Sequence, residues 1–143
     1  LLELRKLPEQ VLDAFNAAGW TYCIDFDYMG GLSKKLNMSC IGATNYSQKT
    51  IYLSDSSATL HEFGHFLDWM LGFPAGHEQL FRAEAAAAPL RDYAKTNARE
   101  YFADCFDYCI IHGNDSKMME ILRKNAPQTC KYFEELKKDN WSR

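Results

Sequence analysis

Residues 58–71, ATLHEFGHFLDWML, form the strongest helical segment of the chain. The segment follows a run of N-cap residues, Ser54 to Ser57, and Gly72 and Pro74 come directly after it. We therefore expect a helix from Ala58 to Leu71. Its first half carries the pattern HExxH at positions 61 to 65.

The HExxH pattern predicts a zinc site. Residues four apart lie one above the other on a helix, so His61 and His65 can offer two imidazole nitrogens to one ion. Glu62 is rotated away from them and cannot ligate the same ion, but it can reach a water molecule that the ion holds. This makes Glu62 the candidate general base, and we expect one Zn²⁺ per chain.

A catalytic zinc ion usually has three protein ligands, so a third must come from elsewhere in the chain. A continuation of the motif to a third histidine is excluded, because Asp68 and Leu71 stand where its glycine and histidine would be. His77 is interpreted as an exposed residue at the start of a helix. Asp68 has two open interpretations: it orients a ligating histidine, or it lies on a solvated face.

Glu100 is the candidate third ligand. It lies near the start of a predicted helix, and Asp104 follows on the same face, where it can accept a hydrogen bond from the far N–H of a ligating histidine. Asn97 and Glu100 also resemble a capping pair at a helix start, and the two interpretations are compatible.

The remaining segments place strands first and helices after. Residues 21–28 alternate apolar and polar side chains, which predicts one strand that ends at Gly30 and Gly31. Two more strands, joined as a hairpin by the loop 45–49, are expected at 39–44 and 50–53. Helices are expected over residues 7–20, 78–88, 98–111, 115–124 and 127–138.

This order predicts an α+β fold in a single domain, 1–143, with a sheet-bearing part, 1–55, and a helical part that carries the zinc site, 56–143. The chain of 143 residues is 47% hydrophobic, enough to bury a core without a metal. A net charge of −3 without a basic block argues against nucleic-acid and anionic-membrane partners. No apolar run is long enough to span a membrane. The five cysteines include no CxxC and are interpreted as packing residues.

Three segments together resemble the zinc-peptidase domain of anthrax lethal factor and the related small secreted Pro-Pro endopeptidases of clostridia. They are HEFGHFLD at 61–68, YAKTNAREYFAD at 93–104, and KNAP at 124–127 with Thr129. The resemblance covers about the C-terminal half of the chain. Asp104 departs from it, since lethal factor has the longer Glu there.

The resemblance implies a zincin-like fold with a small mixed sheet against the active-site helix. It assigns the metal ligands to His61, His65 and Glu100, the general base to Glu62, and a catalytic role to Tyr93. A neutral phenol at position 93 can donate a hydrogen bond to the developing oxyanion.

The implied activity is zinc-dependent endopeptidase cleavage of an extended protein segment by a secreted, toxin-related bacterial protein that acts as a monomer. The segment Gly42, Ala43 and Thr44 resembles the edge strand on which such enzymes bind substrate, although an ordinary sheet strand explains it equally. The alternative function is a zinc-bearing binding module, derived from such a peptidase, that does not cut its partner.

Overall fold

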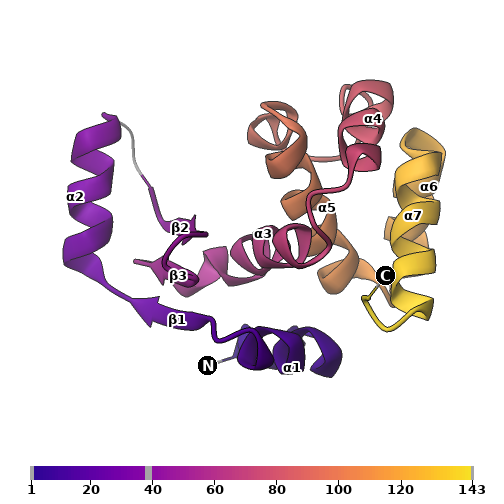
Figure 1. The fold of residues 1–143 in the computed structure, drawn as a ribbon. Helices are drawn as coiled ribbons and strands as arrows, with labels where there is room; N and C mark the ends of the chain where they lie inside the picture. Colours follow the sequence, from indigo (N-terminus) through magenta and orange to yellow (C-terminus); the bar gives the residue numbers. More distant parts are fainter. Residues whose placement is uncertain (1, 38–39, 143) are drawn as a thin grey trace.

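The computed structural model describes residues 2–37 and 40–142 and has an α+β fold (Figure 1). In these ranges it has seven α-helices and one sheet of three strands. The strands are β1 (Thr21–Ile24), β2 (Gly42–Asn45) and β3 (Thr50–Leu53). The helices are α1 (Glu9–Ala17), α2 (Phe26–Leu36), α3 (Thr59–Met70), α4 (Ala75–Glu84), α5 (Ala98–His112), α6 (Ser116–Asn125) and α7 (Pro127–Lys138). Three short 3₁₀ helices are η1 (Leu4–Lys6), η2 (Ser56–Ala58) and η3 (Asp92–Lys95).

Helix α3 lies at the centre of the molecule, between the sheet and α5 (Figure 1). Every residue from Thr59 to Asp68 is buried, including the polar ones. Phe63 and Phe66 pack against Phe15 of α1, and the same core includes Ile51 of β3 and Phe102 of α5. A helix buried on all sides must find partners for its polar side chains inside the protein.

Helices α3 and α5 approach each other very closely at Gly64. A Cβ atom at this position would lie 2.6 Å from the Cα atom and 2.9 Å from the carbonyl oxygen of Ala103. Position 64 therefore has to be glycine for the backbones of α3 and α5 to lie this close together. Because Glu100 and Asp104 flank Ala103 on α5, the contact brings both carboxylates against the HExxH face of α3.

The sheet has the order β1-β3-β2, with β1 parallel and β2 antiparallel to β3. The predicted hairpin is confirmed, although Asn45 belongs to β2 and pairs with Thr50, so the loop is 46–49. Ser39, the predicted start of this strand, lies outside the described residues. Strand β2 is an edge strand that packs on α3, so its outer edge has no strand partner within the described ranges.

The prediction of one long strand over 21–28 is wrong. Strand β1 ends at Ile24, and the side chain of Asp25 accepts a hydrogen bond from the backbone N–H of Tyr28 at 2.9 Å, which caps α2. Phe26 and Tyr28 continue the apolar alternation by coincidence, since they belong to the first turns of a helix. Gly30 and Gly31 lie inside α2 rather than ending a strand.

The helical half agrees more closely with the prediction. Helix α7 has the predicted bounds, α5 ends one residue later than predicted, and α3 and α6 differ from their predicted bounds by one residue at each end. Helix α4 runs from Ala75 to Glu84 instead of 78–88, because Pro74 fixes a backbone angle suited to the position before a helix. The interpretation of the cysteines as packing residues fits Cys105 and Cys130, which are both fully buried.

Replacing Gly64 by Ala tests the close contact between α3 and α5. We expect the free energy of unfolding, measured by urea denaturation of the metal-free chain, to fall by about 1–3 kcal/mol because backbone atoms must shift. Gly30→Ala is the matched control, since a Cβ at this position in α2 meets nothing within 4 Å. That change should stabilise the protein by about 0.5–1 kcal/mol through helix propensity. Equal effects at the two positions would contradict the steric argument.

Candidate metal centre

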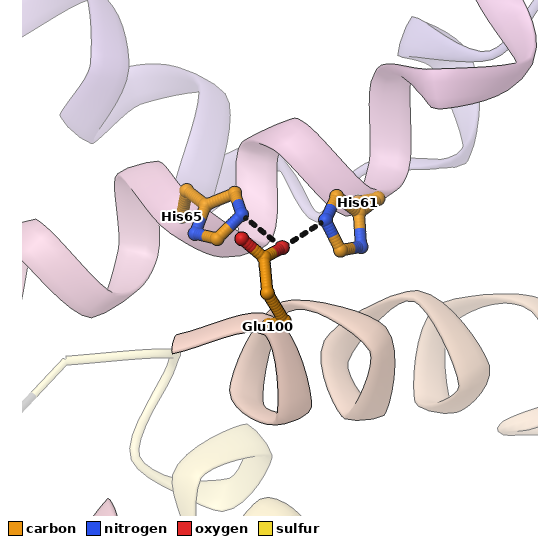
Figure 2. A group of neighbouring side chains, drawn as sticks. All are labelled: His61, His65 and Glu100. Atoms are coloured by element: carbon orange, nitrogen blue, oxygen red, sulfur yellow. Dashed lines mark hydrogen bonds and ion pairs between the residues drawn. The ribbon is translucent and has the colours of Figure 1, made fainter. Parts of the chain in front are cut away.

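Three side chains from two helices converge on one point (Figure 2). His61 and His65 of α3 both direct Nε2 at Oε1 of Glu100 on α5, each at 2.9 Å. The three candidate ligand atoms all lie within 4.8 Å of one another. Both histidines are buried, and the Glu100 side chain is 17% exposed. Two nitrogens and one carboxylate oxygen arranged in this way can hold a metal ion.

The far nitrogen of each histidine ring also has a partner. His61 Nδ1 is hydrogen-bonded to Asp104 Oδ1 at 2.5 Å, and His65 Nδ1 lies 3.4 Å from the hydroxyl of Tyr46. Partners of this kind fix the ring orientation and leave Nε2 facing the ion. Asp104 was a sequence candidate for this position. Tyr46 was missed, because nothing in the sequence distinguishes it from the other tyrosines.

Arg91 was also missed, and it supports two site residues at once. Its Nε and Nη2 donate to the two oxygens of Asp104 at 2.8 and 3.0 Å. Its guanidinium carbon lies 5.0 Å from the ring centre of Tyr93. Burial acts to raise the pKa of Asp104, but hydrogen bonds from His61 and Arg91 outweigh it and lower that pKa. Asp104 is therefore held ionised beside His61.

The electrostatics of the cluster favour a cation. Burial acts to lower the pKa of His61, yet hydrogen bonds to Asp104 and Glu100 raise it to about 9. For Glu100, burial acts to raise the pKa, and hydrogen bonds from the two histidines lower it well below its ordinary range. A cluster that attracts protons in this way also attracts a metal ion, which would compete with them. The donor set, the burial and the oriented rings all fit a bound metal.

Glu62 is positioned by strand β2. Thr44 donates from Oγ1 to Glu62 Oε1 at 2.8 Å. A Cβ at position 42 would lie 2.9 Å from Glu62 Oε2 and 2.9 Å from the Cβ of Ala58, so Gly42 leaves the room that the carboxylate occupies. The structure therefore brings the predicted segment Gly42, Ala43 and Thr44 to the candidate base.

Tyr93 lies at the opening of the site, in η3. Its ring centre is 5.9 Å from that of His61, and the residue is 43% exposed. Burial of the hydroxyl group, followed by the charge of Glu100, raises the pKa of Tyr93 to about 12. The phenol therefore remains a neutral hydrogen-bond donor at pH 7.

The sequence interpretations of Asp68 and His77 do not hold in detail. Asp68 is not on a solvated face: it is 2% exposed and bonds Nδ1 of His77 at 2.7 Å. His77 is not an exposed helix-start residue. It is buried, stacks on Phe102 and bonds the Tyr132 hydroxyl through Nε2 at 2.6 Å. Asp68 therefore orients this buried histidine, and no hydrogen bond to His61 or His65 is found for it in the described structure.

A cleft of about 650 Å³ opens beside the convergent side chains. Its lining includes Glu62, His65, Tyr93 and Glu100 from the site, together with strand β2 residues 42–44. A smaller hollow of about 380 Å³ lies on the His61 side. The site is thus open to a ligand on both sides of Glu62, which lines both spaces.

Comparison with known proteins identifies the family. Residues 6–136 match the family described as anthrax toxin lethal factor, N- and C-terminal domain. The chain belongs to this family. Lethal factor of Bacillus anthracis is 29% identical to it over 92 residues, which cover 56% of this chain and 11% of that protein. This lethal factor-family chain therefore spans about a tenth of the length of the curated relative that it matches.

No helix in the described parts of this lethal factor-family chain is long and apolar enough to cross a membrane.

Removing the carboxylate of Asp104 tests whether it orients a metal-binding histidine. Asp104→Ala should weaken Zn²⁺ binding about 10–100-fold, because His61 loses the partner of Nδ1. Affinity is measured by competition with a chromogenic chelator. Asp13→Ala on the exposed face of α1 is the matched control and should bind zinc like the unmodified chain. Unchanged affinity in Asp104→Ala, with folding verified by urea denaturation, would contradict the role given to Asp104.

Proposed function

We propose that this protein is a zinc-dependent endopeptidase that hydrolyses peptide bonds in extended protein segments. One observation carries the proposal: the donor atoms of His61, His65 and Glu100 converge beside Glu62 in a cleft bordered by an edge strand. Membership of the lethal factor family supports it. The HExxH pattern at 61–65 is the sequence signature of the same chemistry.

The three convergent residues would hold the zinc ion. Two histidines and a glutamate are a common ligand set of catalytic zinc, and they leave a position for water or substrate. When bound, a zinc ion lowers the pKa of a coordinated water to about 7 and polarises a carbonyl group. Asp104, held in place by Arg91, keeps His61 in the orientation that this requires.

Glu62 acts as the general base and then as the general acid. Its carboxylate accepts the proton of the attacking water and later delivers that proton to the nitrogen of the leaving amine. Thr44 holds one carboxylate oxygen by a hydrogen bond of 2.8 Å, which limits the rotation of the side chain. Tyr93 donates a hydrogen bond to the oxygen on which negative charge develops.

The substrate is proposed to bind as an additional strand along β2. An edge strand offers unpaired backbone groups to an extended peptide, and Gly42, Ala43 and Thr44 lie beside Glu62. We propose further that residues 1–143 form a single catalytic domain, that the protein acts as a secreted monomer, and that its zincin-like fold presents α3 under this strand. The family's description as part of a toxin supports secretion.

A second candidate function is a zinc-bearing module that binds a protein without cutting it. The description of the matched family covers two domains of lethal factor and names no activity for either. The positions of Glu62 and Tyr93 favour catalysis, because a binding module needs neither a base nor an oxyanion donor. Incubation with a mixed peptide library, with and without a chelator, distinguishes the two: new peptide termini that disappear with the chelator support the peptidase.

Glu62→Gln tests the general base. We expect zinc binding to persist, because Glu62 is not among the three convergent donors, and peptide cleavage to fall below detection because the amide cannot accept the proton. Cleavage is followed by mass spectrometry, and zinc content is measured on the same samples. Glu9→Gln, on an exposed part of α1, is the control and should cleave normally. If the Glu62→Gln variant cleaves peptides as fast as the unmodified chain, Glu62 is not the general base.

Tyr93→Phe tests the oxyanion donor. Deleting one such donor costs about 3 kcal/mol of transition-state stabilisation, so kcat should fall roughly 100-fold with little change in KM. Tyr28→Phe, on α2 where the ring stacks against Tyr52, changes the same atom outside the cleft and should leave kcat unchanged. If Tyr93→Phe and the unmodified chain have the same kcat, Tyr93 does not act as the oxyanion donor.

A further inference from the structure

An exposed arginine lies on the wall of the cleft beside the metal ligands. Arg99 precedes Glu100 in the first turn of α5, and both line the cleft with His65 and Tyr46. Within the described lining of this cleft, Arg99 is the sole lysine or arginine. A cation in the first turn opposes the helix macrodipole, so helix stability does not account for it.

Two aromatic rings hold the Arg99 guanidinium in place. Its central carbon lies 3.9 Å from the ring centre of Phe73 and 5.6 Å from that of Tyr46. The two rings contact each other edge to face at 5.3 Å. Stacking restrains the guanidinium plane and leaves its N–H groups at the edges free to donate.

The backbone at Phe73 supports this arrangement. Phe73 has φ of 48°, a left-handed conformation that costs free energy in a bulky residue. Its N–H donates to the carbonyl oxygen of Asp68 at 2.9 Å, as part of the turn that ends α3. This turn places the Phe73 ring at the cleft, under the Arg99 side chain.

The acidic side chains that line the cleft form their ion pairs and hydrogen bonds with residues other than Arg99. In the described structure, no hydrogen bond or ion pair joins its side chain to another residue. Asp68 is buried and bonded to His77, and Glu78 pairs with Arg82 at 3.0 Å. Glu100 is bonded to His61 and His65, and Glu62 accepts a hydrogen bond from Thr44.

We propose that Arg99 binds a carboxylate of the peptide substrate and so selects substrates with an acidic residue on the His65 side of the scissile bond. This rests on the proposed function, since it names the substrate class of the same cleft. The stacked, unpaired guanidinium presents two N–H groups in the geometry that a carboxylate accepts. The carboxylate could belong to an acidic side chain or to the C-terminus of a short peptide, and the test separates the two.

The test measures binding apart from cleavage. The zinc-loaded Glu62→Gln variant, which cannot turn substrate over, is used with a library of extended peptides in which each position in turn carries Glu or Gln. Each peptide is made with a free and with an amidated C-terminus. The readout is the ratio of affinities for the Glu and Gln forms at each position, with and without the additional change Arg99→Gln. Arg5→Gln, which changes an exposed arginine in η1 outside the cleft lining, is the matched control.

We expect a Glu-to-Gln affinity ratio of about ten at positions on one side of the cleavage site, falling to about one in Arg99→Gln and unchanged in Arg5→Gln. A preference that follows the free C-terminus instead of the side chain identifies the peptide end as the ligand. The proposal is overturned if the ratio is near one with Arg99 present, if no library peptide binds, or if Arg99→Gln leaves the ratio intact. A purely structural role of Arg99 would weaken both forms equally and preserve the ratio. The proposed peptidase function is tested in a separate experiment with the unmodified, zinc-loaded chain. If that chain cleaves no peptide, the proposed function is wrong.

Discussion

The close contact of α3 and α5 at Gly64 is the constraint on which the rest of the site depends. The two helices meet where one has no side chain and the other has only the methyl group of Ala103. Ligands carried by different helices can share an ion only if the helix axes are close enough for a short side chain to reach across. Glu100 reaches both histidines from α5 with its Oε1 atom. The glycine inside HExxH thus contributes to the convergence of the three candidate ligands through its small size.

Around this contact, each chemically important side chain is restrained by a different element of the fold. Arg91 holds Asp104 against His61, Tyr46 from the hairpin loop reaches His65, and β2 limits Glu62 through Thr44. Removing several charged groups from water costs free energy, and these hydrogen bonds offset that desolvation cost. The arrangement explains why the site needs the sheet as well as the two helices, although the convergent donors come from helices alone.

The sequence was sufficient for the parts of the fold and site that depend on local spacing. The i, i+4 pair His61 and His65 follows from helix geometry, and the bounds of α7 follow from Pro127 and the apolar period. Contacts between residues that are far apart in the chain produce no local spacing pattern in the sequence. For this reason Arg91 and Tyr46 were missed, and the burial of His77 was predicted wrongly. Helix α2 was missed for a different reason: its first residues continue the alternation of β1, and only the cap by Asp25 separates the two.

The position of α5 is also fixed by a buried hydrogen-bond network that joins it to α4 and α7. The carboxylate of Glu84, buried at the end of α4, accepts hydrogen bonds from the N–H and hydroxyl of Thr129 at 2.7 Å, which caps the start of α7. The Tyr101 hydroxyl bonds Thr129 Oγ1 at 2.9 Å. Since Tyr101 is the neighbour of Glu100, this buried network and the Gly64 contact together fix the axial position of α5. Glu100 is the candidate ligand near a helix end, where backbone hydrogen bonds are fewest, and this network restrains it there.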